Sequence, residues 1–222
     1  MQPAEQNAFA QNIASLRLPR YAEIPHIELY MDQLVGYLQE TLRPLYQPDD
    51  KIITPSMVNN YVKQGVIAPP RAKKYTREQV AQLIVIGILK HTFSIGEINH
   101  LIEQQITSFE TDVAYDYFCT ALENACRALF APTSAAPATL TSGSEPGDFE
   151  RDLVIASSAA VAYTLYLRAS IAETSGAASA DGASAGMGRA NASRMSAGAS
   201  RANANAGAGR MGAGRKRDKR GK

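Results

Sequence analysis

The sequence of 222 residues contains no tryptophan, few aromatic residues and no apolar run long enough to cross a lipid bilayer. The uncharged stretch 153–167 has only fifteen residues and includes serine, threonine and tyrosine, whereas a membrane-spanning helix needs about 20 predominantly apolar residues. The first eleven residues are mostly polar, so they do not resemble a secretory signal peptide. We therefore expect a cytoplasmic protein that does not enter a membrane.

Cysteine and histidine are also scarce. The two cysteines, Cys119 and Cys126, lie seven residues apart in a predicted helix, which places their α-carbons about 10 Å apart. A disulfide bond requires α-carbons within about 7 Å, so these cysteines cannot pair with each other. They are either core residues or thiols that sense a signal across a dimer. The three histidines are scattered and indicate no metal site: His26, His91 and His100.

Sets of residues that carry out catalysis are missing from the sequence. It shows no nucleophile with a nearby base and orienting group, and no glycine-rich loop of the kind that cradles a phosphate. We therefore expect a protein that is not an enzyme and that needs no cofactor or metal. The sequence names no small-molecule effector.

Positive charge is concentrated in one segment. Residues 51–77 include six basic residues and no acidic residue, whereas the rest of residues 1–174 carries 7 basic against 19 acidic residues, a net charge of −12. Lysine and arginine that contact phosphates displace condensed counterions, and acidic surroundings limit non-specific binding. The segment therefore predicts phosphate contacts, although chance clustering of surface lysines around a turn is the alternative. The six residues are Lys51, Lys63, Arg71, Lys73, Lys74 and Arg77.

The basic segment opens with a short predicted helix. Thr54 can accept a hydrogen bond from an unpaired backbone N–H, and Pro55 suits the first helical position because it has no N–H. Gly65 supplies the left-handed residue that ends such a helix. Two consecutive prolines then prevent further helix and favour an extended exit. A short β-wing over residues 70–76 fits the basic residues that follow.

Two capping boxes mark the starts of further helices. Thr76 with Gln79, and Ser94 with Glu97, each place a hydroxyl three residues before a side chain that can bond back to the backbone. The apolar residues after each box recur at helical spacing, which predicts two helices that pack in the core. Upstream, a helix from Pro25 to Pro44 shows the same apolar period and would support the short helix that begins at Pro55.

These signals resemble those of a DNA-binding fold, the MerR-type winged helix. The residues that carry the resemblance are Tyr61, Gly65, Pro69, Lys73, Tyr75, Val80, Leu83, Ile86, Phe93, Ser94, Glu97 and Ile98. The stretches HIELYMDQLVGYLQ, TPSMVNNYVKQGV, PPRAKKYTREQV and FSIGEI are more closely similar to the bacterial family named domain of unknown function 1836, over about residues 20–170. The resemblance implies a mainly α fold with a MerR-like winged helix-turn-helix and a short β-wing. The family label implies no established activity.

A winged helix of this type would place its recognition helix, residues 55–64, in the major groove and its wing, residues 70–76, against phosphates. Asn59 and Lys73 stand where MerR proteins usually carry arginine. Lysine is a point charge and holds phosphate less rigidly than arginine. Asparagine amides either read adenine in the groove or merely face solvent. The predicted DNA-binding residues are Ser56, Asn59, Asn60, Lys63, Arg71, Lys73, Lys74, Tyr75 and Arg77.

Two further helices are predicted in the C-terminal part. The first, residues 111–130, has an apolar stripe broad enough for two neighbours, and the second runs from Phe149 to about Glu173. Because the second helix is nearly apolar through its middle, it must pack either on the preceding helix or on a second copy across a two-fold axis. We favour a homodimer, which would read two DNA half-sites.

From Thr174 onward the composition changes to glycine, alanine, serine and asparagine, with ten basic residues against two acidic ones. Such a segment buries too little apolar surface to offset the entropy of ordering, so we expect disorder. It would be either a basic tether to DNA or a solubilising tail. The predicted organisation is a flexible N-terminus (1–20), a winged helix-turn-helix (21–105), a C-terminal helical region (106–174, with a linker at 131–147) and a disordered basic tail (175–222).

Two functions fit these features. The first is a transcription regulator that binds double-stranded DNA through the recognition helix and the basic wing. The second is a protein-interaction module in which the winged helix and the C-terminal helices bind a protein partner, since a fold does not determine a function. Binding to duplex DNA that weakens as salt rises favours the first, because phosphate contacts release counterions.

Overall fold

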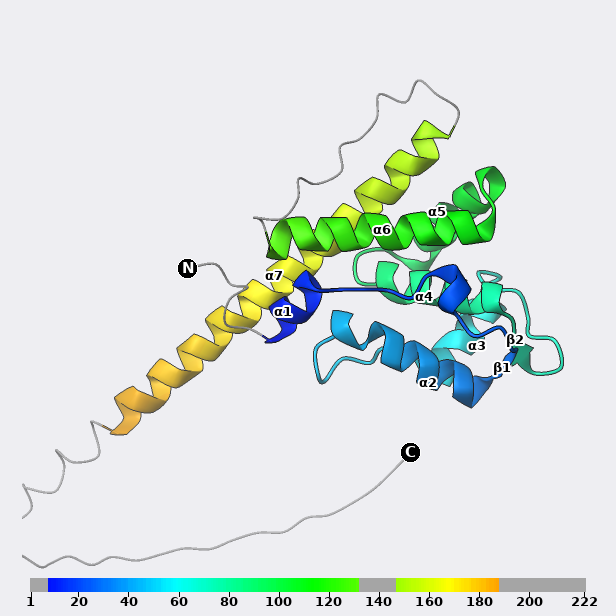
Figure 1. Ribbon diagram of the computed structural model, residues 1–222. Helices are drawn as coiled ribbons and strands as arrows, with labels where there is room; N and C mark the ends of the chain where they lie inside the picture. The colour runs from blue at the N-terminus through cyan, green and yellow to red at the C-terminus, as the bar shows by residue number, and fades with distance from the viewer. Residues whose placement is uncertain (1–7, 132–146, 188–222) are drawn as a thin grey trace, which may run out of the picture. The chain divides into compact units, whose positions relative to one another are not determined.

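The computed structural model describes residues 8–131 and 147–187 (Figure 1). Within them the chain forms mainly α-helices and one two-stranded sheet, so the predicted mainly α fold is confirmed. The chain divides into two units, 1–178 and 179–222, and the described part of the second is the end of α7. The elements are α1 (Ala8–Ala14), η2 (Tyr21–Glu23), β1 (Leu29–Tyr30), α2 (Met31–Leu42), η3 (Arg43–Leu45), α3 (Pro55–Lys63), β2 (Lys74–Tyr75), α4 (Arg77–Leu89), α5 (Ile95–Ser108), α6 (Thr111–Phe130) and α7 (Asp148–Met187).

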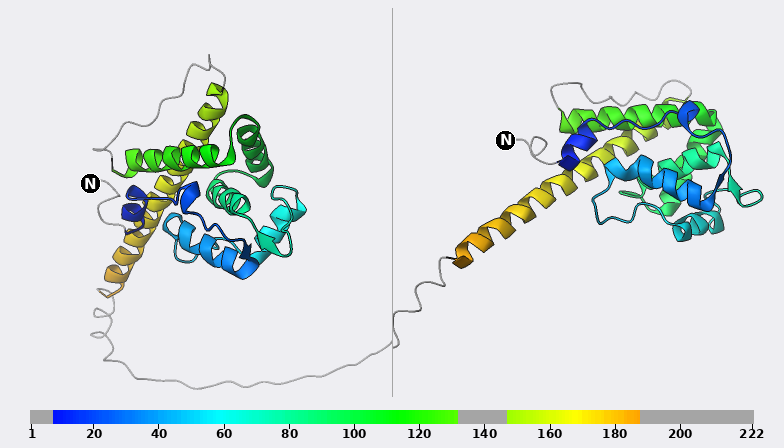
Figure 2. Two further views of the ribbon diagram at one scale, coloured as in Figure 1. Left: turned by 45° about the vertical axis from the view of Figure 1, so that its right-hand side comes forward. Right: turned by 60° about the horizontal axis from the view of Figure 1, so that its bottom comes forward.

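Helix α4 packs against α2, α5 and α6 in the middle of the fold (Figure 2). Nine of its 13 residues are buried, as expected for a helix that is apolar on all sides. Gly87 allows α2 to approach closely, because a Cβ at this position would collide with the side chain of Leu42. The Tyr46 hydroxyl donates a hydrogen bond to the Gly87 carbonyl at 2.6 Å. Packing against α4 therefore fixes the positions of α2, α5 and α6.

The three helix starts predicted between residues 54 and 97 are confirmed. The side-chain oxygens of Thr54, Thr76 and Ser94 accept hydrogen bonds from the N–H three residues on, at 3.3, 3.4 and 3.4 Å. In return, the side chains of Gln79 and Glu97 accept from the N–H groups of Thr76 and Ser94 at 2.8 and 2.7 Å. These caps determine where α3, α4 and α5 begin.

The predicted helix from Pro25 to Pro44 begins later than expected. Helix α2 starts at Met31, because the N–H of Tyr30 donates to Oε1 of Gln33 at 3.0 Å and so caps the helix. The residues immediately before it form β1, which pairs antiparallel with β2. Ile27, which helical periodicity places on the apolar stripe, is 70% exposed. Strand pairing therefore replaces the predicted helix at Leu29 and Tyr30, and Ile27 lies in the bend before the strand.

The prediction of a flexible N-terminus is wrong for residues 8–20. Helix α1 packs against α6 and buries Ile13, and the following chain buries Leu18. The guanidinium of Arg20 donates two hydrogen bonds to the carboxylate of Glu123, at 2.8 and 2.7 Å. The N–H of Leu18 donates to the same carboxylate at 2.8 Å. Contacts with a distant helix order this segment, and its seven-residue helix is too short for a clear apolar period.

Helix α6 has the predicted bounds, whereas α7 begins at Asp148 and continues to Met187. The boundary predicted at residue 174 therefore falls within α7, which continues over residues 175–187. These residues are rich in alanine, which has the highest helix propensity. The predicted disorder of residues 188–222 and the linker residues 132–146 lie outside the described residues.

Residues 148–172 of α7 are long and apolar enough to cross a membrane by length and composition alone. Core helices of water-soluble proteins meet the same criterion, and 39% of the most apolar window of this segment is buried in the structure. Val154, Val161 and Leu165 are among the buried side chains. The feature alone is weak evidence for a membrane span.

The ion pair between Arg20 and Glu123 leads to a prediction about stability. Glu123→Gln keeps the shape of the side chain but removes the charge that satisfies Arg20 and the Leu18 N–H. Breaking a buried ion pair costs roughly 3–5 kcal/mol, and Arg20 retains 32% exposure. We therefore expect the free energy of unfolding to fall by about 2 kcal/mol, measured by urea denaturation.

The exposed pair of Arg17 and Glu23 provides a matched control, because its side chains are 67% and 44% exposed. Arg17→Gln should leave the urea midpoint unchanged, since solvent screens exposed ion pairs. Equal losses in the Glu123→Gln and Arg17→Gln proteins would contradict a structural role specific to the buried pair.

Candidate nucleic-acid interface

Helix α3 turns one face to the core and the other to solvent. Val58 and Tyr61 are buried. All four predicted recognition residues of this helix are exposed: Ser56, Asn59, Asn60 and Lys63. The side chain of Gln64 donates to Oδ1 of Asn60 at 3.3 Å, so the Asn60 amide already has one partner. The helix has nine residues, so its polar and cationic face is about 13 Å long.

The chain before α3 is held by hydrogen bonds from two neighbouring helices. Lys90, at the end of α4, donates its Nζ to the carbonyl of Lys51 at 3.2 Å and to the carbonyl of Ile52. Gln39 on α2 donates its Nε2 to the carbonyl of Ile53 at 2.9 Å. Burial lowers the pKa of Lys90. These bonds fix the entry of α3 against α2 and α4.

A tight turn connects the end of the α3 region to β2. Arg71 and Lys74 exchange backbone hydrogen bonds of 3.1 and 2.9 Å. The residues between them, Ala72 and Lys73, have φ angles of 48° and 64°, as in a type I′ turn. Residues other than glycine adopt this conformation at a cost of about 1 kcal/mol each. The turn therefore holds the exposed Lys73 side chain at its tip.

The predicted β-wing over residues 70–76 forms only in part. One isolated bridge, between Arg71 and Lys74, lies within the turn. The strand β2 takes β1 as its partner, with Leu29 opposite Tyr75. The wing residues thus belong to a small sheet whose second strand comes from far upstream in the sequence.

Tyr75 differs from the other predicted contact residues. Its side chain is 2% exposed, and burial raises the pKa of its hydroxyl. Neighbouring residues of a strand point to opposite sides, and here Lys74 is half-buried while Tyr75 faces the core. The structure therefore assigns Tyr75 to the core and excludes it from the predicted phosphate contacts.

Two cations of the basic segment lie over aromatic rings. The Nζ of Lys74 is 5.1 Å from the ring centroid of Tyr30, and the Cζ of Arg77 is 5.4 Å from that of Tyr21. The Nη2 atom of Arg77 is buried and has no hydrogen-bond partner among the described residues. Sequence reasoning missed both tyrosines, because they lie upstream of the basic segment. The alternation of apolar and polar residues over 27–30 is the only local signal in the sequence that could have indicated a strand at Tyr30. The other four cations are exposed: Lys51, Lys63, Arg71 and Lys73.

A largely buried histidine connects α7 to the chain before α3. The ring of His91 lies 4.4 Å from that of Tyr46, and its Nδ1 lies 3.1 Å from Nη1 of Arg168. A guanidinium can only donate, so Nδ1 accepts and the proton of the neutral ring is on Nε2. Burial, and then the charges of Arg168 and Lys90, lower the pKa of His91 to about 4, against the opposing charge of Asp50.

The buried His91 predicts a fall in stability as the pH is lowered from 6.5 to 4. Above pH 6.5 the ring is neutral in both the folded and unfolded states and contributes no pH dependence. Below it, the unfolded chain binds a proton that the folded protein excludes. The free energy of unfolding therefore falls by up to about 1.4 kcal/mol per pH unit.

Urea denaturation across this pH range, for the unchanged protein and for His91→Gln, measures the effect. The difference in stability between the two proteins should change with pH, because glutamine does not titrate while the carboxylates remain the same in both. A difference that stays constant from pH 6.5 to 4 would contradict a histidine that is neutral in the fold.

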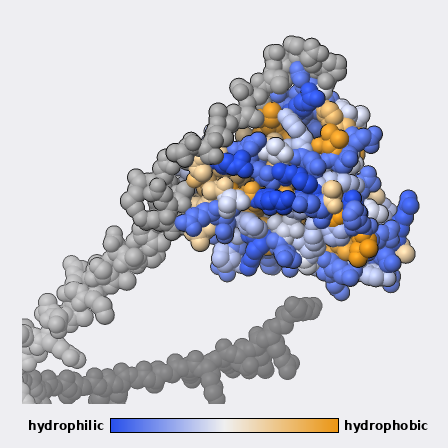
Figure 3. All heavy atoms as spheres, viewed as in Figure 1, coloured by the Kyte–Doolittle hydropathy of each residue, from blue (hydrophilic) through white to orange (hydrophobic). Residues whose placement is uncertain are grey.

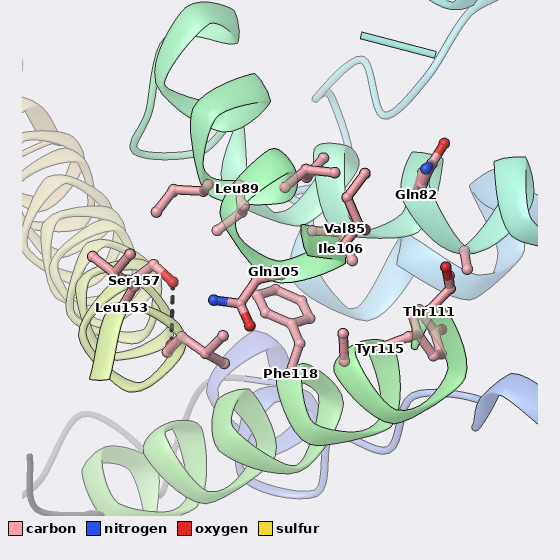
Figure 4. Close-up of a pocket in the computed structure, with 15 residues that line it drawn as sticks. Gln82, Val85, Leu89, Gln105, Ile106, Thr111, Tyr115, Phe118, Leu153 and Ser157 are labelled. Carbon is pink, nitrogen blue, oxygen red and sulfur yellow. Dashed lines mark hydrogen bonds between the residues drawn. The ribbon is translucent and has the colours of Figure 1, made fainter. Parts of the chain in front are cut away.

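Helices α4, α5, α6 and α7 surround an apolar cavity of about 60 Å³ (Figure 4). Two polar side chains at its edge bond to the backbone: Gln105 donates to the Glu150 carbonyl at 2.7 Å, and Ser157 donates to the Val154 carbonyl at 3.1 Å. Apolar cavities of about 150 Å³ hold a molecule of the size of benzene. This cavity is therefore too small to hold such a molecule. Its lining includes Val85, Leu89, Ile106, Phe118 and Leu153.

Both cysteines lie in the core. Cys119 and Cys126 have no exposed surface, and burial raises the pKa of each thiol to about 12. Such thiols stay protonated at neutral pH, whereas the thiolate is the reactive form. The structure therefore supports the interpretation of both cysteines as core residues rather than as sensing thiols. In the part of the chain that the structure describes, no group of three or more His, Cys, Asp or Glu residues is placed to hold a metal ion.

The basic segment also lies within a region that matches a known family. Residues 19–118 match the family model described as Domain of unknown function (DUF1836). The match begins before η2, includes α3, the turn and α4, and ends within α6. It is shorter than the resemblance expected over residues 20–170, so α7 lies outside it. No curated protein and no solved structure matches the chain.

Proposed function

We propose that this protein is a cytoplasmic, DNA-binding transcription regulator with a MerR-like winged helix-turn-helix. The proposal rests on the distribution of charge. Residues 51–77 have six cations and no carboxylate, while the rest of residues 1–174 has a net charge of −12. The basic surface is defined as the exposed side of α3 with the turn and the start of α4. Its residues are Ser56, Asn59, Asn60, Lys63, Arg71, Lys73, Lys74 and Arg77.

The size and chemistry of α3 suit the major groove of DNA. The groove is about 12 Å wide and admits an α-helix, and asparagine amides form paired hydrogen bonds with adenine. Asn59 and Asn60 are exposed on a helix whose start is capped by Thr54 and whose entry is held by Lys90. A recognition helix fixed in this way loses little freedom on binding, which favours affinity.

The turn suits contact with phosphates. Arg71, Lys73 and Lys74 place three cations within four residues, and the left-handed backbone holds the middle one at the tip. Phosphate contacts supply affinity and register, whereas the groove supplies sequence preference. In Figure 1 the connection between α3 and β2 projects beyond the helices, where a duplex can approach it. The acidic remainder of the body would repel DNA from other faces.

Salt dependence tests the proposal. If about four cations per subunit, hence about eight per dimer, contact phosphate, log K should fall with log salt at a slope near −7. Replacing Lys73 and Lys74 together by glutamine removes about four contacts per dimer, so the slope should fall to about −4. Fluorescence anisotropy with duplexes selected from random sequences, at several salt concentrations, measures both slopes.

Two further variants control this experiment. Arg127→Gln removes a cation of α6 outside the basic surface and should leave affinity and slope unchanged. Asn59→Ala should keep the slope but relax the base preference, because a paired amide–adenine contact discriminates by about 1–3 kcal/mol. Weak duplex binding that is insensitive to salt in the unchanged protein would contradict DNA binding.

An exposed apolar face of α7 supports a homodimer as the binding form. At 100° per residue its four large side chains lie within about 80° of one another, and the buried Val161 and Leu165 lie on the opposite side. The first turn of α7 contains the acidic residues Asp148 and Glu150, whereas Arg168 lies about five turns further along the helix. An antiparallel pair of α7 helices would bring these opposite charges together. The exposed side chains are Phe149 (61%), Tyr163 (57%), Leu167 (59%) and Ile171 (61%).

A charge placed on this face should separate the dimer. Leu167→Glu would bury two carboxylates against an apolar partner, so the protein should become monomeric, as measured by sedimentation equilibrium. Val113→Glu is the matched control, because Val113 on α6 is 56% exposed but lies outside the α7 face. A monomeric unchanged protein, or a dimer insensitive to Leu167→Glu, would contradict this interface.

The α7 face is equally compatible with a second candidate function, a protein-interaction module that binds a different protein through the winged helix and the C-terminal helices. Exposed apolar patches mark protein interfaces in general, so the face itself does not choose between the candidates. The salt experiment separates them. A regulator binds duplex DNA with the slope given above, whereas an interaction module shows no such binding.

A further inference from the structure

Tyr30 lies on the solvent side of the small sheet, directly opposite a cation of the basic surface. The register pairs Tyr30 with Lys74, and the Lys74 Nζ lies 5.1 Å from the centre of the tyrosine ring. Leu29 and Tyr75 form the neighbouring pair and are both buried. Because alternate residues of a strand point to opposite faces, the buried pair holds the Tyr30–Lys74 pair at the surface.

Two large side chains at and just before β1 are exposed to solvent. Tyr30 is 52% exposed, and Ile27, three residues earlier, is 70% exposed. Figure 3 shows hydrophobic side chains at the surface near β1, on a face that is otherwise mostly hydrophilic. A large ring left half in solvent beside a lysine contributes little to the core, but it gives the cation a fixed support.

We propose that Tyr30 is a positioning residue of the basic surface, which holds the Lys74 ammonium over its ring in the place where a DNA phosphate binds. This inference rests on the proposed DNA binding. A free lysine side chain loses about 2 kcal/mol of rotamer entropy when it is fixed, and a cation already held over a ring has lost part of it before binding. The ring carries no charge and makes no phosphate contact of its own.

The pair of Tyr21 and Arg77 has a similar geometry but a different setting. The N–H of Tyr21 donates to Asp116 on α6 at 2.7 Å, and its ring lies 6.3 Å from that of Tyr115. Substitution of Tyr21 would therefore disturb the packing of the chain on α6. The Tyr30 ring is about half exposed and lies beside Lys74, so its variants disturb the core less than variants of Tyr21.

A double-mutant cycle in the full-length protein tests the proposal. Tyr30→Leu should weaken binding to a selected duplex about threefold, the effect of losing one exposed cation–π contact. Tyr30→Phe keeps the ring and should bind like the unchanged protein. In a Lys74→Gln background, Tyr30→Leu should have no further effect. Tyr117→Leu changes a tyrosine of α6 outside the basic surface and should leave binding unchanged.

Nuclear magnetic resonance of the free protein gives a second readout. The ring should shift the Lys74 ε-methylene proton signals upfield in the unchanged and Tyr30→Phe proteins, and Tyr30→Leu should abolish this shift. Absence of the shift in the unchanged protein would overturn the inference whatever the DNA result. Equal weakening by Tyr30→Leu with and without Lys74 would also overturn it. In both cases salt-dependent DNA binding would still stand, whereas no duplex binding by the unchanged protein would overturn both proposals.

Discussion

Burial of α4 on all sides is the constraint on which the basic surface depends. A helix without a polar face must be covered by other elements, and α2, α5 and α6 provide the cover. The residue before its first turn, Thr76, directly follows β2, so the helix sets the position of the turn. Beyond its other end, Lys90 holds the chain that enters α3, and His91 contacts α7. Core packing thus determines the spacing between α3 and the turn.

The chain before α2 ties the C-terminal helices to the basic surface. Glu123 of α6 is nearly buried, and a buried carboxylate is stable only when its oxygens have partners. Arg20 and the Leu18 N–H provide them. The same stretch then supplies the tyrosine rings beside Arg77 and Lys74. The cationic surface is therefore assembled from two segments that are well separated in the sequence.

Much of the candidate site could be predicted because its signals are local. A cap at Thr54, Thr76 or Ser94 acts on an N–H only three residues away, and the exposed side of α3 follows from its apolar period. The burial of Tyr75 could not be predicted in this way, because the side that a strand residue faces depends on the partner strand. For the same reason the start of α2 was placed too early, since helical periodicity alone does not show that β1 pairs with β2.

By itself the sequence determined the helix starts of the basic segment, the concentration of positive charge in residues 51–77 and the mainly α composition, because each depends on neighbouring residues or on simple counts. Only the tertiary structure decided that residues 8–20 pack on α6, that Tyr75 belongs to the core, and that Tyr21 and Tyr30 lie beside cations. These features depend on contacts between distant segments, and no local propensity encodes which distant partner a buried or paired group will meet.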